Sequence, residues 1–165
     1  MYKNNQSLNE KLIISATNYA REFLNIDEEL WVFINDSKHF MGINHSALYD
    51  KENFIIRFNK DWLINATEDN ILKTAFHEVF HVFQHTCLLE IELGYNRGIF
   101  TNNELEKMKH EFLDENYSTE LGQYENLLIE QQAETFAHEF YKTFKSEFNN
   151  ICGLIEKYNE KYINK

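Results

Sequence analysis

The amino-acid sequence predicts a compact α+β domain in which a small antiparallel sheet packs against two long helices. The length of 165 residues fits one domain with a sizeable core. Two segments, 67–89 and 123–148, have apolar residues at helical spacing. Stretches rich in β-branched and aromatic residues precede the first of these segments. Strands grouped ahead of long helices are typical of α+β domains.

The N-terminal part is expected to contain one helix and three strands. Ser7 and Glu10 have the spacing of a capping box, and the segment that follows has apolar residues on one face, which predicts a core-facing helix. The segment 30–35 predicts a first strand. The segments 40–49 and 54–59 predict a hairpin joined by a polar turn.

The segment 90–123 separates the two long helices and is predicted to be an insertion. It contains a short helical pattern at 104–112 between glycines. Two interpretations remain open, a lid that shapes a binding site and a packed helical excursion. A last helix is predicted at 151–163.

The segment 67–89 contains the pattern His-Glu-x-x-His. His77 and His81 are four residues apart, so on a helix they lie one above the other and can bind one zinc ion. Glu78 beside them can take a proton from a water that the metal holds. Most of the remaining helix surface is apolar, which is typical of a buried helix. Alternatively, the two histidines are core residues hydrogen-bonded to carbonyl groups.

A catalytic zinc site usually has three protein ligands, so the two histidines need a partner. Cys87 points away from the histidines on a helix, and Cys152 has no second cysteine at ligand spacing, so neither predicts a ligand or a disulfide. Glu130 and Glu134 lie one turn apart in the second long helix. One of them can complete the site while the other accepts the free ring N–H of a histidine ligand. Alternatively, both are solvated surface carboxylates.

These two segments resemble the motifs of the ImmA/IrrE-type zinc metallopeptidases. Residues 77–85 resemble the pattern HExxHxxxH, and residues 130–137 resemble the pattern ExEANxFA. The second match has Gln132 at the middle glutamate and Glu134 where the family usually has asparagine or aspartate. Residues 53–59 resemble the hairpin strand xxIxxN that precedes the family's active-site helix. Two histidines with a distant glutamate are also similar to gluzincins in general.

The resemblance covers about residues 30–90 and 124–145. It implies a single zincin-like metallopeptidase domain over residues 1–165, with an insertion at about 90–123. It implies that His77, His81 and Glu130 bind zinc. It further implies that Glu78 is the general base and that Glu134 orients a ligand imidazole. It also implies a narrow, regulatory protein substrate. We expect that substrate to bind in an extended conformation along the strand at 53–58.

Peptidases of this kind need a donor, often a tyrosine or a histidine, that stabilises the tetrahedral oxyanion. The sequence does not choose among the candidates, which are His138, Tyr141, Tyr124, Tyr117 and Tyr95. His85 lies one helical turn beyond His81 on the same face of the helix. It either contacts substrate or is a plain surface or core residue.

The composition restricts the partners that we expect. A net charge of −11 argues against nucleic acid, because binding to a phosphate backbone depends on Lys and Arg. No apolar run approaches the length that spans a membrane, and charges interrupt the N-terminal apolar residues, so no signal peptide is expected. The two cysteines are expected to be free thiols. A cytoplasmic location and a protein or peptide partner follow as expectations.

The sequence therefore predicts a zinc-dependent endopeptidase. An alternative is a non-catalytic zincin-fold binding protein, although zinc binding alone does not require Glu78. A third possibility is a structural helical protein with a fortuitous motif. A metal assay distinguishes the structural helical protein from the other two classes. An activity assay on zinc-loaded protein distinguishes the binding protein from the endopeptidase.

Overall fold

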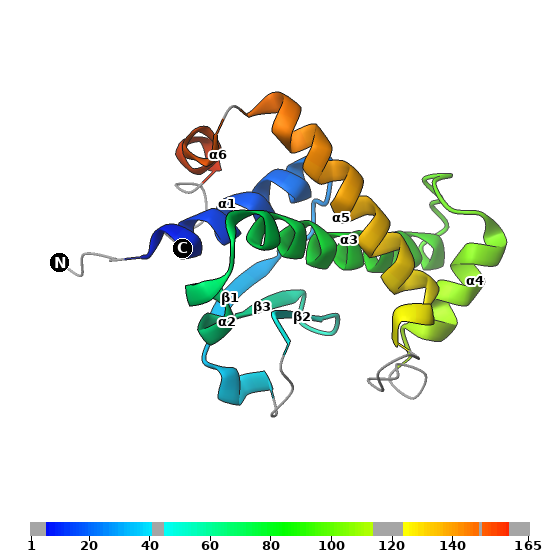
Figure 1. The fold of residues 1–165 in the computed structure, drawn as a ribbon. Helices are drawn as coiled ribbons and strands as arrows, with labels where there is room; N and C mark the ends of the chain where they lie inside the picture. Colours follow the sequence, from blue (N-terminus) through cyan, green and yellow to red (C-terminus); the bar gives the residue numbers. More distant parts are fainter. Residues whose placement is uncertain (1–5, 41–44, 114–123, 149, 159–165) are drawn as a thin grey trace.

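The long helix α3 (Glu68–Glu92) is the central element of the fold (Figure 1). We describe residues 6–40, 45–113, 124–148 and 150–158 of a computed structural model. Helix α1 (Leu8–Phe23) packs beside α3, and α5 (Leu128–Glu147) crosses above it in Figure 1. The sheet lies on the lower side of α3 in the same view. The α+β class predicted from the sequence is therefore confirmed.

The sheet is mixed, so the prediction of an antiparallel sheet is wrong. Strand β3 (Ile55–Asn59) is central, antiparallel to β2 (Ala47–Asp50) and parallel to β1 (Trp31–Asn35). The predicted hairpin is present as β2 and β3. The long connection between β1 and β2 brings β1 to the far side of β3. Because β3 is paired on both sides, it is not the edge strand that we expected to receive a substrate.

The second predicted strand is shorter than the segment 40–49. A 3-10 helix, η1 (Ser37–Phe40), occupies its start, residues 41–44 lie outside the described residues, and β2 begins only at Ala47. The short helix α2 (Lys60–Asn65) follows β3 and was not predicted. The side chain of Asn59 caps it by accepting from the backbone N–H groups of Asp61 and Trp62.

The predicted long helices form, and capping side chains mark the starts of α1 and α3 but not that of α5. The capping box of Ser7 and Glu10 is present at the start of α1. Thr67 caps α3 through its hydroxyl group. The second long helix begins at Leu128 rather than at residue 123. The remaining elements are α4 (Asn102–Glu111), η2 (Tyr124–Asn126) and α6 (Ile151–Tyr158).

The main core surrounds α3 on most of its circumference. Phe76 and Val79 on α3 are fully buried, and so are Ile13 on α1 and Ile56 on β3. A helix that is buried all round is held by packing on several sides, so its side chains have little freedom to move. The polar side chains on the buried central turns of α3 are therefore held in nearly fixed positions.

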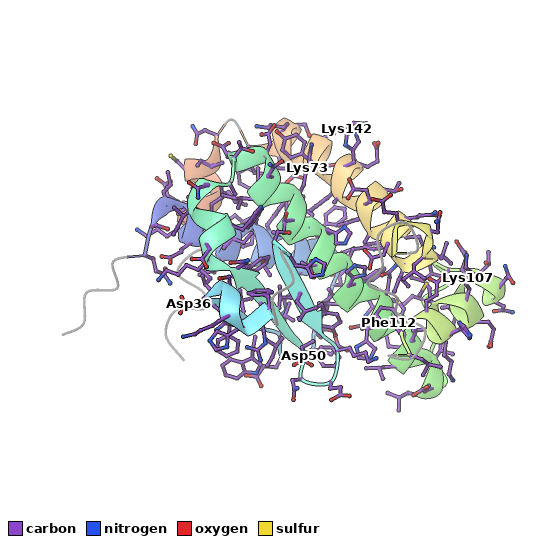
Figure 2. All side chains as sticks on the ribbon, turned by 60° about the horizontal axis from the view of Figure 1, so that its bottom comes forward. Asp36, Asp50, Lys73, Lys107, Phe112 and Lys142 are labelled. Atoms are coloured by element: carbon purple, nitrogen blue, oxygen red, sulfur yellow. The ribbon has the colours of Figure 1, made fainter. Side chains whose placement is uncertain are left out.

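Helix α4 packs where the end of α3 meets the start of α5. Leu105 and Met108 of α4 are buried together with Ile129 of α5 in a second, smaller core. Figure 2 shows Lys107 and Phe112 at this end of the helix pair, opposite Lys73 and Lys142. The segment that the sequence sets apart as an insertion thus supports the end of the fold from which α5 starts.

None of the helices in the described part of the chain is long and apolar enough to cross a membrane. Both cysteines are free thiols, with Cys87 buried and Cys152 exposed.

Candidate metal centre

Helix α3 places two imidazoles in contact. His77 and His81 are one turn apart, and their ring centroids are 4.7 Å apart at an interplanar angle of 83°. The two Nε2 atoms are 3.0 Å apart. Because neighbouring α3 residues such as Phe76 and Val79 are buried, the backbone that carries the two rings is fixed by packing.

Helix α5 brings a carboxylate to the same point. Ala133 and Ala137 are buried where α5 meets α3, and their small side chains allow the two helices to approach closely. Glu130, in the first turn of α5, is 3% exposed. Its Oε2 is 3.1 Å from Nε2 of His77, and its Oε1 is 3.3 Å from Nε2 of His81.

This cluster can hold a metal ion. One donor atom from each of His77, His81 and Glu130 lies within 4.8 Å of the others. Imidazole nitrogen and carboxylate oxygen are common ligands of zinc, and three protein ligands leave a coordination position open. The side chains that the sequence analysis expected to act as ligands therefore lie together, and their chemistry fits the expected metal.

Without a metal, protons hold the cluster together. Burial raises the pKa of Glu130, but hydrogen bonds from His77 and His81 outweigh it, so this pKa lies well below its ordinary value of 4.5. Burial lowers the pKa of His81, but the hydrogen bond and charge of Glu130 outweigh that effect and hold this pKa above 6.5. A metal ion would compete with these protons, because it binds the neutral imidazole.

The two shifts have opposite consequences for stability. The depressed pKa of Glu130 contributes stability that is present above 4.5 and is lost as the pH falls through the folded value. The raised pKa of His81 contributes stability that is complete below 6.5 and is lost as the pH rises through the folded value. The stability that these two groups contribute to the metal-free protein is therefore expected to be greatest between pH 4.5 and 6.5.

Glu78 lies beside the cluster and is 8% exposed. Burial raises its pKa, while the charges of His77 and His81 act in the opposite direction. A carboxylate with a raised pKa is a better proton acceptor than a solvated one, which is the property that a general base needs.

Glu134 lies on the other side of His77. Its Oε2 is 3.7 Å from Nδ1 of His77, and its side chain is 78% exposed. This distance is longer than a hydrogen bond but within reach of an ion pair. Glu134 therefore faces the nitrogen that a carboxylate orienting His77 would contact, and not the Nε2 side on which Glu130 lies.

The residue that holds the second imidazole was not predicted from the sequence. Oε1 of Gln84 is 3.0 Å from Nδ1 of His81, and Gln84 is fully buried. Nε2 of Gln84 donates to the carbonyl of Ile129 at 3.1 Å and to Oε1 of Gln132 at 3.0 Å. The available signal was the position of Gln84 three residues after His81, which lies on the same helix face.

The remaining candidates lie at different places. His138 is exposed on α5. The hydroxyl of Tyr141 donates to Asp69 at the start of α3, two turns before His77. Tyr124 begins η2, but its side chain lies outside the described structure, as does all of Tyr117.

His85, one turn beyond His81, contacts the sheet. Its Nδ1 lies 2.9 Å from the hydroxyl of Tyr49 on β2, and its ring stacks on Phe54 with centroids 5.2 Å apart. Burial lowers the pKa of His85, which favours the neutral ring. His85 therefore connects α3 to the hairpin.

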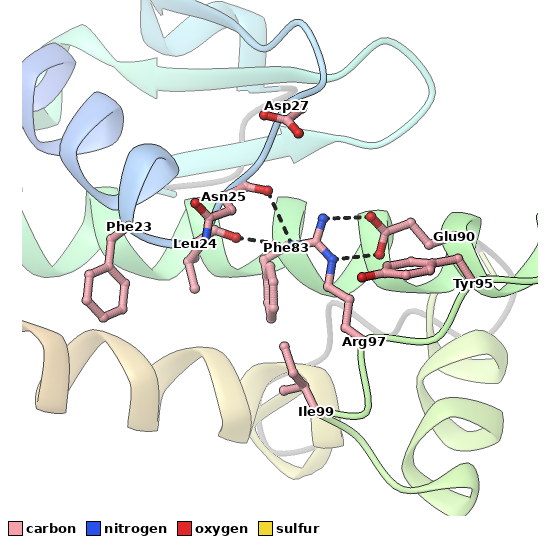
Figure 3. A pocket seen from close by; sticks show the side chains of 9 residues that line it. All are labelled: Phe23, Leu24, Asn25, Asp27, Phe83, Glu90, Tyr95, Arg97 and Ile99. Carbon is pink, nitrogen blue, oxygen red and sulfur yellow. Dashed lines mark hydrogen bonds and ion pairs between the residues drawn. The ribbon is translucent and has the colours of Figure 1, made fainter.

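A hollow of about 580 Å³ lies on another side of α3. Figure 3 shows Arg97 at its centre, with its guanidinium paired to Glu90 and to the backbone carbonyls of Leu24 and Asn25. Phe83 and the remaining candidate donor, Tyr95, also line it. Phe83 is two residues after His81, so the two side chains point away from each other on the helix. Tyr95 is thus not beside the histidine cluster.

Comparisons with models of known protein families, with curated proteins and with solved structures gave no match for this chain.

Proposed function

We propose that this protein is a zinc-dependent endopeptidase. The observation that carries the proposal is the meeting of His77, His81 and Glu130 beside the buried carboxylate of Glu78. A site that only binds metal needs the three ligands but not a buried carboxylate next to them. The resemblance of residues 77–85 and 130–137 to ImmA/IrrE-type metallopeptidases supports the same assignment.

His77, His81 and Glu130 would hold the metal. When bound, zinc would supply a Lewis acid that polarises a peptide carbonyl and lowers the pKa of a water molecule. Glu78 would take the proton of the attacking water and pass it to the leaving amine. The burial that raises the pKa of Glu78 favours the first of these transfers.

A peptide substrate would pair with β2 rather than with β3. β2 is at the edge of the described sheet, whereas β3 has a partner on each side. Tyr49 on β2 contacts His85, which lies one turn beyond His81 on α3. An extended peptide added to β2 would therefore run beside His81 and His85, with its backbone held by strand hydrogen bonds. The substrate would be a specific, regulatory protein.

Zinc stoichiometry and peptide cleavage together test the proposal. Purified protein is loaded with Zn²⁺, its metal content is measured, and it is incubated with a combinatorial peptide library whose new termini are identified by mass spectrometry. We expect about one zinc per chain and cleavage that is lost in Glu78→Gln. One zinc per chain with no difference between the parent and Glu78→Gln would favour the non-catalytic binding protein. No zinc binding would overturn the proposal.

A further inference from the structure

A chain of hydrogen bonds connects the cluster to α4. Nδ1 of His81 contacts Oε1 of Gln84 at 3.0 Å. Nε2 of Gln84 donates to Oε1 of Gln132 at 3.0 Å. Nε2 of Gln132 donates to Oε1 of Glu104 at 3.2 Å. This series of hydrogen bonds runs from α3 to α5 and then to α4, which lies in the segment that the sequence sets apart as an insertion.

The carboxylate of Glu104, at the end of this series, fixes which group donates and which accepts in each hydrogen bond. Glu104 can only accept, so Gln132 must present its NH₂ group to it and its carbonyl oxygen to Gln84. Gln84 then donates to Gln132 and to the carbonyl of Ile129. Its carbonyl oxygen remains for His81, so Nδ1 of His81 must carry a proton. Nε2 of His81 is then the ring atom left to bind a metal.

We propose that Gln84, Gln132 and Glu104 are positioning residues that hold His81 in the Nδ1-protonated form, with Nε2 directed toward His77 and Glu130. This rests on the metal-binding part of the proposed function. Partners that fix the tautomer and orientation of a histidine ligand typically change metal affinity about 10- to 100-fold. Helix α4 is thereby a part of the metal centre without touching the metal.

The surroundings of Gln84 and Glu104 stabilise this series of hydrogen bonds. Gln84 is fully buried, so water does not compete for its amide. Hydrogen bonds from the backbone and hydroxyl of Thr101 hold the pKa of Glu104 below its usual value, which keeps its carboxylate ionised. Glu111, also on α4, accepts from the backbone N–H of Ile129 at 3.0 Å and so attaches α4 to the first turn of α5.

The tautomer of His81 in metal-free protein is the first readout. It is measured in Glu130→Ala protein, because the carboxylate of Glu130 would otherwise accept from Nε2 of His81 and compete with Gln84. At alkaline pH, where the imidazole is neutral, ¹⁵N chemical shifts distinguish a ring protonated at Nδ1 from one protonated at Nε2. We expect Nδ1 protonation in Glu130→Ala protein and a mixture when Gln84→Met is added, since methionine has similar size and offers no acceptor of comparable strength. Gln84→Glu restores an acceptor and is expected to restore Nδ1 protonation, even where its unfolding temperature is lower.

Zinc affinity is the second readout, measured with Zn²⁺ alone against a competing chelator. We expect Gln84→Met to weaken binding about 10- to 100-fold and Gln132→Met to weaken it less. In the double variant, Gln132→Met should add almost nothing to the loss of zinc affinity caused by Gln84→Met, because both changes break the same series of hydrogen bonds. The matched control is Gln131→Met, since Gln131 is the exposed neighbour of Gln132 on α5 and should bind zinc as the parent does.

The two readouts separate failure of this proposal from failure of the proposed function. Nδ1 protonation in Glu130→Ala protein, lost when Gln84→Met is added, supports the positioning role even if the parent binds no zinc, and only the metal-dependent function then fails. Gln84→Met that keeps Nδ1 protonation, or that loses it while binding zinc within about twofold of the parent, overturns the positioning role. Equal losses of unfolding temperature in Gln84→Met and Gln84→Glu with unequal zinc affinities would exclude a purely structural explanation.

Discussion

Replacing Glu78 with glutamine is expected to separate the proposed catalysis from metal binding. Glutamine has nearly the shape of glutamate, so it fits a position that is 8% exposed without disturbing His77 or His81. An amide does not accept a proton near neutral pH. Loss of general base catalysis costs roughly 10²- to 10⁴-fold in rate, or about 3 to 5 kcal/mol of transition-state stabilisation.

The same substitution is expected to stabilise the metal-free protein. Burial raises the pKa of Glu78, so its contribution to stability is complete below 4.5 and is lost as the pH rises through the folded value. Glutamine stays neutral at every pH and avoids this loss. We therefore expect Glu78→Gln to raise the free energy of unfolding, and with it Tm, near neutral pH.

Three measurements check this prediction. Cleavage of the peptide library gives the rate, a chelator competition gives the zinc affinity, and calorimetry in the presence of a chelator gives Tm. The matched control is Glu106→Gln, since Glu106 is exposed on α4 and the same change there should leave all three unaltered. Glu78→Gln protein that cleaves at the parental rate would refute the proton transfer, and one that unfolds several degrees earlier would refute the cost of burying its charge.

Four further predictions concern the ligands, their support and pH. Glu130→Ala is expected to weaken zinc binding more than about 100-fold, beyond the usual effect of a residue that only orients a ligand; affinity equal to the parent's would remove Glu130 from the ligand set. Glu134→Ala is expected to weaken it about 10- to 100-fold through Nδ1 of His77, and unchanged affinity would make Glu134 a solvated surface residue. Glu111→Ala should lower the free energy of unfolding by about 1 to 2 kcal/mol, whereas Glu111→Gln keeps an acceptor for the start of α5 and should lose less; identical urea midpoints would contradict this capping role. The loss of stability caused by Glu130→Ala in metal-free protein, followed by urea unfolding across pH, should be greatest between 4.5 and 6.5, and a loss that is greatest well above 6.5 would contradict the protonated pairing of His81 with Glu130.

Local patterns predicted the helices and the contact between His77 and His81 well. Helical periodicity and capping residues such as Ser7 and Thr67 act within one or two turns, so sequence alone locates α1 and α3. The spacing of His77 and His81 also fixes their relative position once the helix is accepted. The proximity of Glu130 to the two histidines was predicted from a second motif, because the geometry of one helix does not say which distant residue packs against it.

The features that the sequence did not reveal depend on the path of the chain. The alternation of apolar residues marks β1 as a strand but does not say whether it runs parallel to β3, which is set by the long connection that follows it. Gln84 contacts Gln132, and Gln132 contacts Glu104, across 48 and 28 residues of sequence. Such pairs have no periodicity, because single amide contacts between helices are set by how those helices pack.

The separation of the ligands has a consequence for synthesis of the chain. His77 and Glu130 lie 53 residues apart, on helices that meet only in the finished fold. A nascent chain that ends before α5 carries both histidines and Glu78, but it lacks the carboxylate that completes the cluster. Domains generally fold as units during synthesis, so the contact between α3 and α5 forms only once both helices have been made. Incomplete chains are therefore expected to lack the complete cluster, and with it the hydrolytic activity that we propose for the finished fold.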